Sequence, residues 1–499
     1  THYPAGLALS PDGRSLYVAE DLADSLAMVD LATKTVVQRV GVDRYPYAVA
    51  VTPDGSVFVS SWNADSVAVF RPTVADRLTR IGKVAAGRHA SALILDRSGS
   101  RLFAASGSTD RITVIDTKGL RVVAELRDTV PHGVPEGATP NALALSPDGM
   151  RLYAAEGDAN AVAVFDLSGA TAGTDAATGN DTFIGRIPTA WYPVSLAVAG
   201  DTLIVASGKG LGTAPDPGGP HPGVVRVRTG PNADRQYTLS QLEGAISIVP
   251  LGRTSPGSLT RRVYAANGWN RPAQGRRYPP FRHVIYILRE NRTYDQVLGD
   301  LPKADGDTAL VFFGRQVTPN AHALAERFGI FDRFFVSAEV SGDGHNWSMA
   351  AYATDYTQKT VPVNYSSHGG RSYDFEGTNR DSLPKDDVAA PAQGFIWNLA
   401  ERAGVSFRDF GERVADEEED GKKVYVGSGA YLAAHTEPTY PGFDLAIPDQ
   451  HRADIWLRQF AEWVEADSMP ALQTILLPRD HTAGGSAGAN TPRAMVADN

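Results

Sequence analysis

The sequence has no cysteine among its 499 residues. This absence excludes disulfides, thiolate metal sites and a cysteine nucleophile, and it leaves the cellular compartment open. There is no apolar run near the roughly eighteen residues that a membrane span needs. The formal net charge is −10, which argues against a general nucleic-acid or anionic-membrane surface. The remaining composition, 42% hydrophobic and 21% charged, is that of a globular protein long enough for two or more domains.

A four-residue turn motif recurs four times in the first half of the chain. Its glycines are 42, 44 and 50 residues apart, at Gly13, Gly55, Gly99 and Gly149. Each copy lies between short apolar stretches that alternate as strands do, and glycine supplies the positive φ that a tight hairpin turn requires. Short strands that repeat every 40 to 50 residues or so are typical of propeller blades. We therefore predict an all-β propeller in this half.

The repeats resemble the YVTN family of β-propellers over roughly residues 1–210. The segments at the position that gives the family its name are Leu16–Glu20 and Leu152–Glu156. A further pair of stretches, 244–249 and 262–266, predicts that the propeller extends to about residue 270. The family implies about seven blades in the full protein. Five or six can be counted, so one or more blades are expected upstream.

After residue 283 the pattern changes to strands followed by helices, which predicts an α/β sheet. The predicted strands are 283–288, 334–340 and 472–477, and the predicted helices are 321–328, 346–353, 395–403 and 455–466. The glycine- and proline-rich residues 207–235 indicate a long surface loop. We divide the chain into a propeller (1–270), a linker (271–282) and an α/β domain (283–499).

Polar side chains of kinds used in catalysis follow each of the three predicted strands. They are Glu290 and Asn291 after the first, Ser341 and His345 after the second, and Asp480 and His481 after the third. Ligands of α/β sheets gather beyond the carboxyl ends of strands. A carboxylate and a carboxamide there could hold a hard cation, and a serine needs a base or a metal to become nucleophilic. The three clusters together predict one site.

Each of these residues also has a purely structural interpretation. Asn291 can satisfy backbone groups in a turn, and Ser341 can cap a helix or a turn. His345 could be a metal ligand, a phosphate contact or a capping residue. The dipeptide Asp480-His481 is common and has little specificity by itself. The repetition at three successive strand ends favours the functional interpretation.

From His283 to its end, the chain resembles the phosphoesterase family that contains bacterial phospholipases C and acid phosphatases, within the alkaline phosphatase superfamily. The matching segments are 283–295, 323–334, 340–347, 364–366, 373–377 and 477–482. The resemblance implies an α/β domain of alkaline phosphatase-like type. It also implies a metal-dependent phosphoric-ester hydrolase with a serine nucleophile, either a phosphatase or a phospholipase C-like phosphodiesterase.

The resemblance also assigns roles to residues of this chain. It makes Ser341, His345 and His481 catalytic, and Glu290, Asn291 and Asp480 ligands of a divalent metal ion (Ca, Mg, Mn or Zn). Arg479 stands where the family has a small amide residue. The family completes its metal site with an Asp-Asp pair and a later His, which are not reached before Asn499. We therefore expect an α/β domain that is incomplete at its C-terminus, with about half a coordination sphere, poor cation binding and no assured activity.

The expected substrate is a phosphate ester, either a small molecule or a lipid headgroup. A choline-bearing diester would favour an aromatic cage, for which Trp347, Tyr352 and Tyr373 are available, although core packing explains them more simply. The resemblance implies a bacterial, extracytoplasmic protein, with a signal peptide outside this chain. The alternative function is a propeller binding or interaction protein whose phosphoesterase-like half is non-catalytic. A propeller oxidoreductase would need a cofactor motif, and none is visible.

Overall fold

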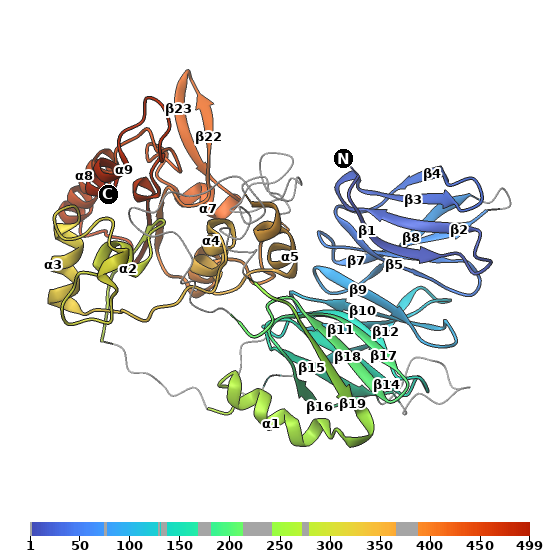
Figure 1. Cartoon of the computed structure of the whole chain (residues 1–499). Helices are drawn as coiled ribbons and strands as arrows, with labels where there is room; N and C mark the ends of the chain where they lie inside the picture. The colour runs from blue at the N-terminus through green and yellow to red at the C-terminus, as the bar shows by residue number, and fades with distance from the viewer. Residues whose placement is uncertain are drawn as a thin grey trace.

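The computed structural model describes residues 2–73, 77–127, 130, 137–167, 181–212, 242–271, 279–365 and 388–499. The N-terminal part consists of consecutive antiparallel sheets, and the C-terminal part has helices around a parallel sheet (Figure 1). Most of the predicted loop at 207–235, most of the predicted linker and the segment 373–377 with Tyr373 lie outside the described residues.

Five antiparallel sheets follow one another in the N-terminal part, each with its strands paired in chain order or its reverse. The first contains β1 (Pro4–Leu9), β2 (Ser15–Glu20), β3 (Ser25–Asp30) and β4 (Thr35–Gly41). The second contains β5 (Pro46–Val51), β6 (Val57–Ser61), β7 (Ser66–Pro72) and β8 (Leu78–Ala85). The third contains β9 (Ala90–Leu95), β10 (Arg101–Ser106), β11 (Arg111–Asp116) and β12 (Arg121–Arg127). The fourth contains β13 (Pro140–Leu145), β14 (Arg151–Glu156), β15 (Ala161–Asp166) and β16 (Thr182–Pro188), and the fifth contains β17 (Pro193–Ala199), β18 (Thr202–Ser207) and β19 (Ala245–Pro250).

These sheets are arranged as consecutive propeller blades. The turn glycines have the predicted positive φ, which is 70°, 83°, 72° and 75° at Gly13, Gly55, Gly99 and Gly149. The first strands of successive sheets pack side by side. Neighbouring sheets bury apolar side chains between them, as Phe103 of the third and Leu152 of the fourth do. The described residues thus contain five blades, and the total of about seven remains a prediction.

The prediction of a strand at 262–266 is wrong. The first half of that pair is β19, but the second half lies in helix α1 (Pro256–Ala266), which packs on β16. Pro256 occupies a favourable first-turn position for a helix. Leu259 and Val263 are one turn apart and pack against neighbouring core clusters. The helical spacing therefore decides the structure of this short apolar stretch.

A parallel sheet organises the C-terminal part. Its strands are β20 (Val284–Arg289), β24 (Leu472–Leu477) and β21 (Phe407–Phe410), in that spatial order. One face is covered by α4 (Ser341–Ala350), α6 (Ile396–Ala403) and α7 (Ala430–His435), and the other by α8 (Asp449–Ala466). Helices on both faces of a parallel sheet confirm the α/β class. Its alkaline phosphatase-like type remains a prediction.

The other elements of this part are shorter or lie outside the sheet. They are α2 (Tyr294–Leu298), α3 (Pro319–Phe328), α5 (Asp355–Asn364), α9 (Pro492–Asp498) and the hairpin β22 (Val414–Glu419) and β23 (Lys422–Gly427), which projects at the top of Figure 1.

Two elements around the second polar cluster differ from the prediction. The range 334–340 forms no strand, and Phe334, Phe335 and Val336 are each about four-fifths exposed. Aromatic and β-branched residues favour a strand only where a neighbouring strand pairs with them, and none of the described strands does so here. The helix predicted at 346–353 is α4, which begins five residues earlier, at Ser341.

A buried ion pair in the fourth blade gives a test of propeller stability. Glu156 and Arg186 are both fully buried, with Arg186 Nε 2.7 Å and Nη2 2.9 Å from the two carboxylate oxygens. The repeat places Glu20 at the equivalent position in the first blade, where its partner Arg39 has a side chain that is 44% exposed.

We expect Arg186→Met to lower the free energy of unfolding by about 3–5 kcal/mol, because Glu156 would be left charged and buried. Arg39→Met should have a much smaller effect, because water can replace the lost partner. Urea unfolding followed by circular dichroism checks both variants. Equal losses in the two variants would contradict a stronger burial of the Glu156–Arg186 pair than of the Glu20–Arg39 pair.

Candidate functional site

The parallel pairing of β20 with β24 brings two of the predicted clusters to one edge of the sheet. The two strands end together, with Arg289 opposite Leu477. Glu290 directly follows β20, and Asp480 lies in the short 3-10 turn just after β24. The second cluster starts at Ser341, the first residue of α4.

Glu290 is the group around which the other residues gather. Its side chain is about one-tenth exposed, and its Oε2 lies 3.5 Å from Nε2 of His345. Burial acts to raise the pKa of Glu290, but the nearby imidazole of His345, the charge of His481 and the Ser341 hydroxyl outweigh it. The net result is a lowered pKa, so Glu290 is held as a carboxylate.

Asn291 contacts the candidate nucleophile. Its side-chain Nδ2 donates a hydrogen bond of 3.1 Å to Oγ of Ser341. The contact leaves the hydroxyl proton of Ser341 available for a second partner. The predicted metal ligand thus orients the serine in this structure.

His345 lies between two carboxylates, and the sequence analysis missed the second. Its Nδ1 is 3.0 Å from Oε1 of Glu412, which is almost fully buried, while Nε2 faces Glu290. A carboxylate on one ring nitrogen fixes the orientation of the other. Glu412 follows β21, so it belongs to a further strand end at the same site.

The segment before Ser341 is held by Asp343. Its two carboxylate oxygens accept the backbone N–H groups of Glu339 and Val340 at 3.1 and 3.0 Å. Burial raises the pKa of Asp343 to about 7, and the charge of Glu339 adds to the rise. Asp343 therefore fixes the first turn of α4, where Ser341 begins the helix.

The third cluster is tied to the first by Arg292. Its guanidinium donates to the carbonyl oxygens of Asp480 and His481 at 2.7 and 2.8 Å. His481 lies edge-on against Phe443 at 5.4 Å between ring centroids, with Nδ1 3.0 Å from the Thr482 carbonyl oxygen. His481 directly follows Asp480 in the turn after β24 and acts on the pKa of Glu290.

Arg479 has a structural role. Its Nη1 lies 2.8 Å from Oδ2 of Asp498 in α9, and its backbone N–H donates to Asp449 at the start of α8. This arginine therefore fastens the turn after β24 to two helices.

The fit of a metal ion can be tested from the oxygen atoms. Oε2 of Glu290 and Oδ1 of Asp480 are buried and have no hydrogen-bond partner within the described ranges. Buried carboxylate oxygens normally have partners, and a hard cation would satisfy both. The same ranges contain no group of three His, Asp or Glu side chains that could hold a metal ion. The donors therefore fit a divalent cation in kind, and Glu290 with Asp480 would hold it.

A second feature is the junction between α5 and the propeller. Tyr356 of α5 is fully buried and packs edge-on against Tyr45 and Trp62. Oδ1 of Asp355 accepts hydrogen bonds from Asn141 and Tyr192, both at 3.1 Å. Residues of the second, fourth and fifth blades therefore contact α5, which follows α4 after a short connection.

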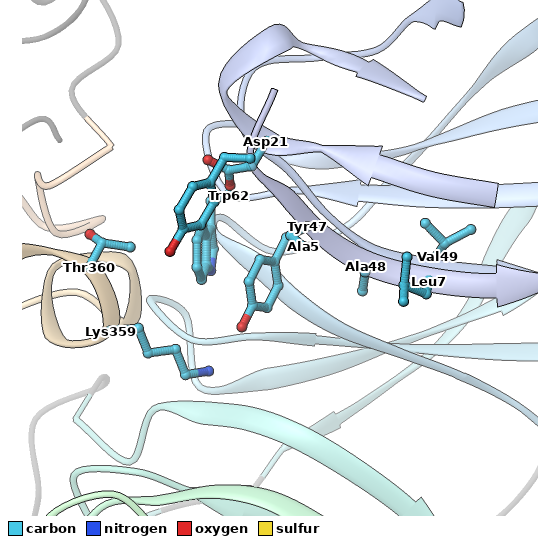
Figure 2. A pocket seen from close by; sticks show the side chains of 11 residues that line it. Ala5, Leu7, Asp21, Tyr47, Ala48, Val49, Trp62, Lys359 and Thr360 are labelled. Carbon is cyan, nitrogen blue, oxygen red and sulfur yellow. The ribbon is translucent and has the colours of Figure 1, made fainter. Parts of the chain in front are cut away.

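A cavity of about 410 Å³ lies at this junction (Figure 2). Tyr47 stacks on Trp62 at 3.7 Å between ring centroids on one side, and Lys359 and Thr360 of α5 form the other. Nζ of Lys359 is already bound to Asp355 at 2.9 Å. The cavity is therefore lined by aromatic rings and by charges that pair within the protein.

Tyr352 belongs to the same junction. Its hydroxyl lies 3.0 Å from Oγ1 of Thr139 and 3.1 Å from the carbonyl oxygen of Gly107, both in the propeller. Trp347 lies in α4 and is partly buried. Tyr352 therefore binds the propeller, and the structure gives it no place in an aromatic cage near Ser341.

Asp480 generates a prediction about pH. Burial raises the pKa of Asp480 to about 7, against the charges of Arg289 and Arg292, and Glu290 adds to the rise. Between about pH 4 and 7 the folded state then binds more protons at this group than the unfolded chain, so stability falls as the pH rises.

In chelator-containing buffer, we expect Asp480→Asn to reduce the loss of stability between pH 5 and pH 8 by roughly 2–4 kcal/mol. Urea titrations at both pH values measure it. Asp12→Asn, at an exposed turn, is the control, and equal pH dependence in Asp480→Asn and wild type would contradict the raised pKa.

A second prediction concerns cations. A divalent ion that binds between Glu290 and Asp480 should raise the thermal midpoint, because it binds only the folded chain. The rise should be larger at pH 8 than at pH 6, since Asp480 must lose its proton first. Differential scanning fluorimetry with Ca, Mg, Mn and Zn salts measures it. Glu290→Gln should abolish the rise, and a rise that survives this change would place the ion elsewhere.

None of the helices in the described ranges is long and apolar enough to cross a membrane.

Comparison with curated proteins gives no match. Among solved structures, the chain is similar to the hydrazine synthase of Kuenenia stuttgartiensis, with 24% identity over 41% of this chain and 55% of that one, at a TM-score of 0.34. It is also similar to a protein from Lactobacillus plantarum (20% identity, 41% and 64% covered, TM-score 0.36) and to virginiamycin B lyase from Staphylococcus aureus (17%, 41% and 63%, 0.32). The matched part spans a little over half to two thirds of each of these proteins. Residues 1–180 match the family model of YNCE-like β-propellers, and with the consecutive antiparallel sheets this match makes the N-terminal part of the chain a β-propeller.

Proposed function

We propose that the α/β part is a metal-dependent phosphoric-ester hydrolase with Ser341 as its nucleophile. The observation that carries the proposal is the convergence on Glu290 of the end of β24 and the start of α4. Nε2 of His345 lies 3.5 Å from this buried carboxylate, Asn291 next to it binds Ser341 at 3.1 Å, and Ser341 and His481 also act on the pKa of Glu290. Purely structural turns would have no reason to gather a hydroxyl and two imidazoles around a carboxylate.

Ser341 has the surroundings of an activated hydroxyl. Its oxygen accepts a hydrogen bond from Asn291, so its own proton can pass to Glu290, whose pKa it already influences. Ser341 is the first residue of the ten-residue helix α4, and the N–H groups at a helix start favour an anion. In the proposed reaction Ser341 Oγ forms a bond to phosphorus, the bond from phosphorus to the ester oxygen breaks, and the leaving alcohol takes a proton. Water then hydrolyses the phosphoserine.

His345 and Glu412 would act as a unit. Glu412 holds Nδ1 of His345, so Nε2 points toward Glu290 and the reacting groups. From this position Nε2 could give a proton to the leaving oxygen or contact the phosphate. A divalent cation held by Glu290 and Asp480 would supply charge for the phosphate oxygens. We propose an extracytoplasmic phosphate ester as the substrate class, with monoesters and diesters both open.

The test is turnover of p-nitrophenyl phosphate and bis-p-nitrophenyl phosphate with added divalent salts. Ser341→Ala should lower kcat at least about a hundredfold, because the covalent route is lost. Ser348→Ala, on the exposed side of the same helix, is the matched control and should keep wild-type rates. An acid quench of the wild type should trap phosphate on Ser341, detected by mass spectrometry. A wild-type protein with no turnover and no bound metal would instead favour the propeller binding protein.

A further inference from the structure

We propose that Lys209, in the fifth propeller blade, is a positioning residue for Ser341 and sets the start of α4 across the junction. The ammonium of Lys209 lies 2.8 Å from Oε1 of Glu339, two residues before Ser341. The side chains of Lys209 and Glu339 are only 20% and 9% exposed. The contact is therefore a largely buried ion pair between the two parts of the chain.

The propeller end of this pair is firmly placed. The backbone N–H of Lys209 donates to the carbonyl oxygen of Trp191, and its own carbonyl oxygen accepts from Gly212. The next residue, Gly210, has φ +52°, and a Cβ there would meet the Glu243 carbonyl oxygen at 1.9 Å. The backbone of Lys209 is therefore held in a defined turn after β18.

The other end acts directly on the candidate nucleophile segment. The backbone N–H groups of Glu339 and Val340 donate to the Asp343 carboxylate, which fixes the chain immediately before Ser341. Oε2 of Glu339 is buried and has no hydrogen-bond partner in the described part of the chain. The ammonium of Lys209 thus balances the charge of the Glu339 carboxylate, which lies beside the carboxyl group of Asp343.

The same lysine also binds α5. Its Nζ lies 2.7 Å from Oε1 of Gln358, and it stands 5.4 Å over the ring of Tyr192, whose hydroxyl binds Asp355. One ammonium therefore links the fifth blade both to the segment before α4 and to the helix that follows it. These contacts give the two ends of the 339–358 region one common reference point on the propeller.

Loss of Lys209 has a definite physical consequence. Glu339 would remain buried beside Asp343 without a cation, and a buried charge that loses its partner is strongly unfavourable. Glu339 would move toward water and release the backbone N–H groups that Asp343 holds. A shift of about 1 Å at a nucleophile lowers a rate by about a hundredfold. The ion pair is therefore expected to matter for kcat while leaving substrate affinity almost intact.

The first experiment does not depend on the proposed hydrolase activity. In the full chain, hydrogen exchange followed by mass spectrometry compares Lys209→Met with wild type. Amides of residues 337–345 should exchange at least about fivefold faster in the variant, while the blade strands stay unchanged. Lys83→Met, an exposed lysine of the second blade, is the control and should have no effect. Unchanged exchange at 337–345 would overturn the proposal.

The second experiment uses charge exchange and rests on the proposed function. Lys209→Arg should retain most of the protection of 337–345, and Lys209→Glu combined with Glu339→Lys should recover at least half of what Lys209→Glu alone loses. In the phosphate-ester assay, Lys209→Met should lower kcat about ten- to a hundredfold with KM changed less than about twofold. If the wild type shows no turnover, the hydrolase proposal fails while the exchange data still decide the role of Lys209. A double variant without recovery would contradict a direct pair.

Discussion

The site depends on the parallel pairing of β20 with β24. Because parallel strands end at the same edge of a sheet, this pairing fixes Glu290 and Asp480 near each other, although 190 residues of sequence separate them. Arg292 then fastens the two strand ends through the carbonyl oxygens of Asp480 and His481. The apolar faces of the sheet supply the stability. Because the apolar faces stabilise the sheet, the edge can retain two buried carboxylate oxygens, of Glu290 and Asp480, that have no hydrogen-bond partner among the described residues. Most buried polar atoms do have such a partner.

The carboxyl groups at this edge differ in their pKa values, so a bound ligand can change which of them is charged. Burial raises the pKa of both Asp343 and Asp480 to about 7, whereas Glu290 is held as a carboxylate by the histidines around it. Carboxyl groups with pKa values this far apart can take different roles in one reaction. Bringing a cation or a proton to Asp480 changes the charge next to Glu290 directly. The edge is therefore electrostatically suited to binding a cation together with an anion.

The sequence predicted several strands and helices, but it did not reveal Glu412 and Lys209, which contact the candidate site residues from other parts of the chain. The strand 472–477 was predicted with its observed bounds, because it is a short segment rich in leucine and β-branched residues. Glu412 was missed because the strand before it is only four residues long and contains Arg408 and Asp409. Asp409 is tolerated in the core since burial raises its pKa to about 8 and Thr474 donates to it at 2.6 Å. Likewise, a single lysine in a glycine-rich turn gives no signal of its own, so Lys209 could be found only from its partner.

The polar contacts between the propeller and α5 fix the orientation of the helix more than they strengthen its binding. Asp355 and Lys359 bring charge into the junction, and polar atoms such as Nε2 of Gln358 are buried without a hydrogen-bond partner among the described residues. An apolar junction of the same size would bind more tightly, but it would tolerate rotation and sliding. Directional hydrogen bonds allow one arrangement, and losing one of them leaves buried charges uncompensated. The docking of α5 is therefore expected to be all or none, which makes the propeller a determinant of the geometry at Ser341 rather than a separate module.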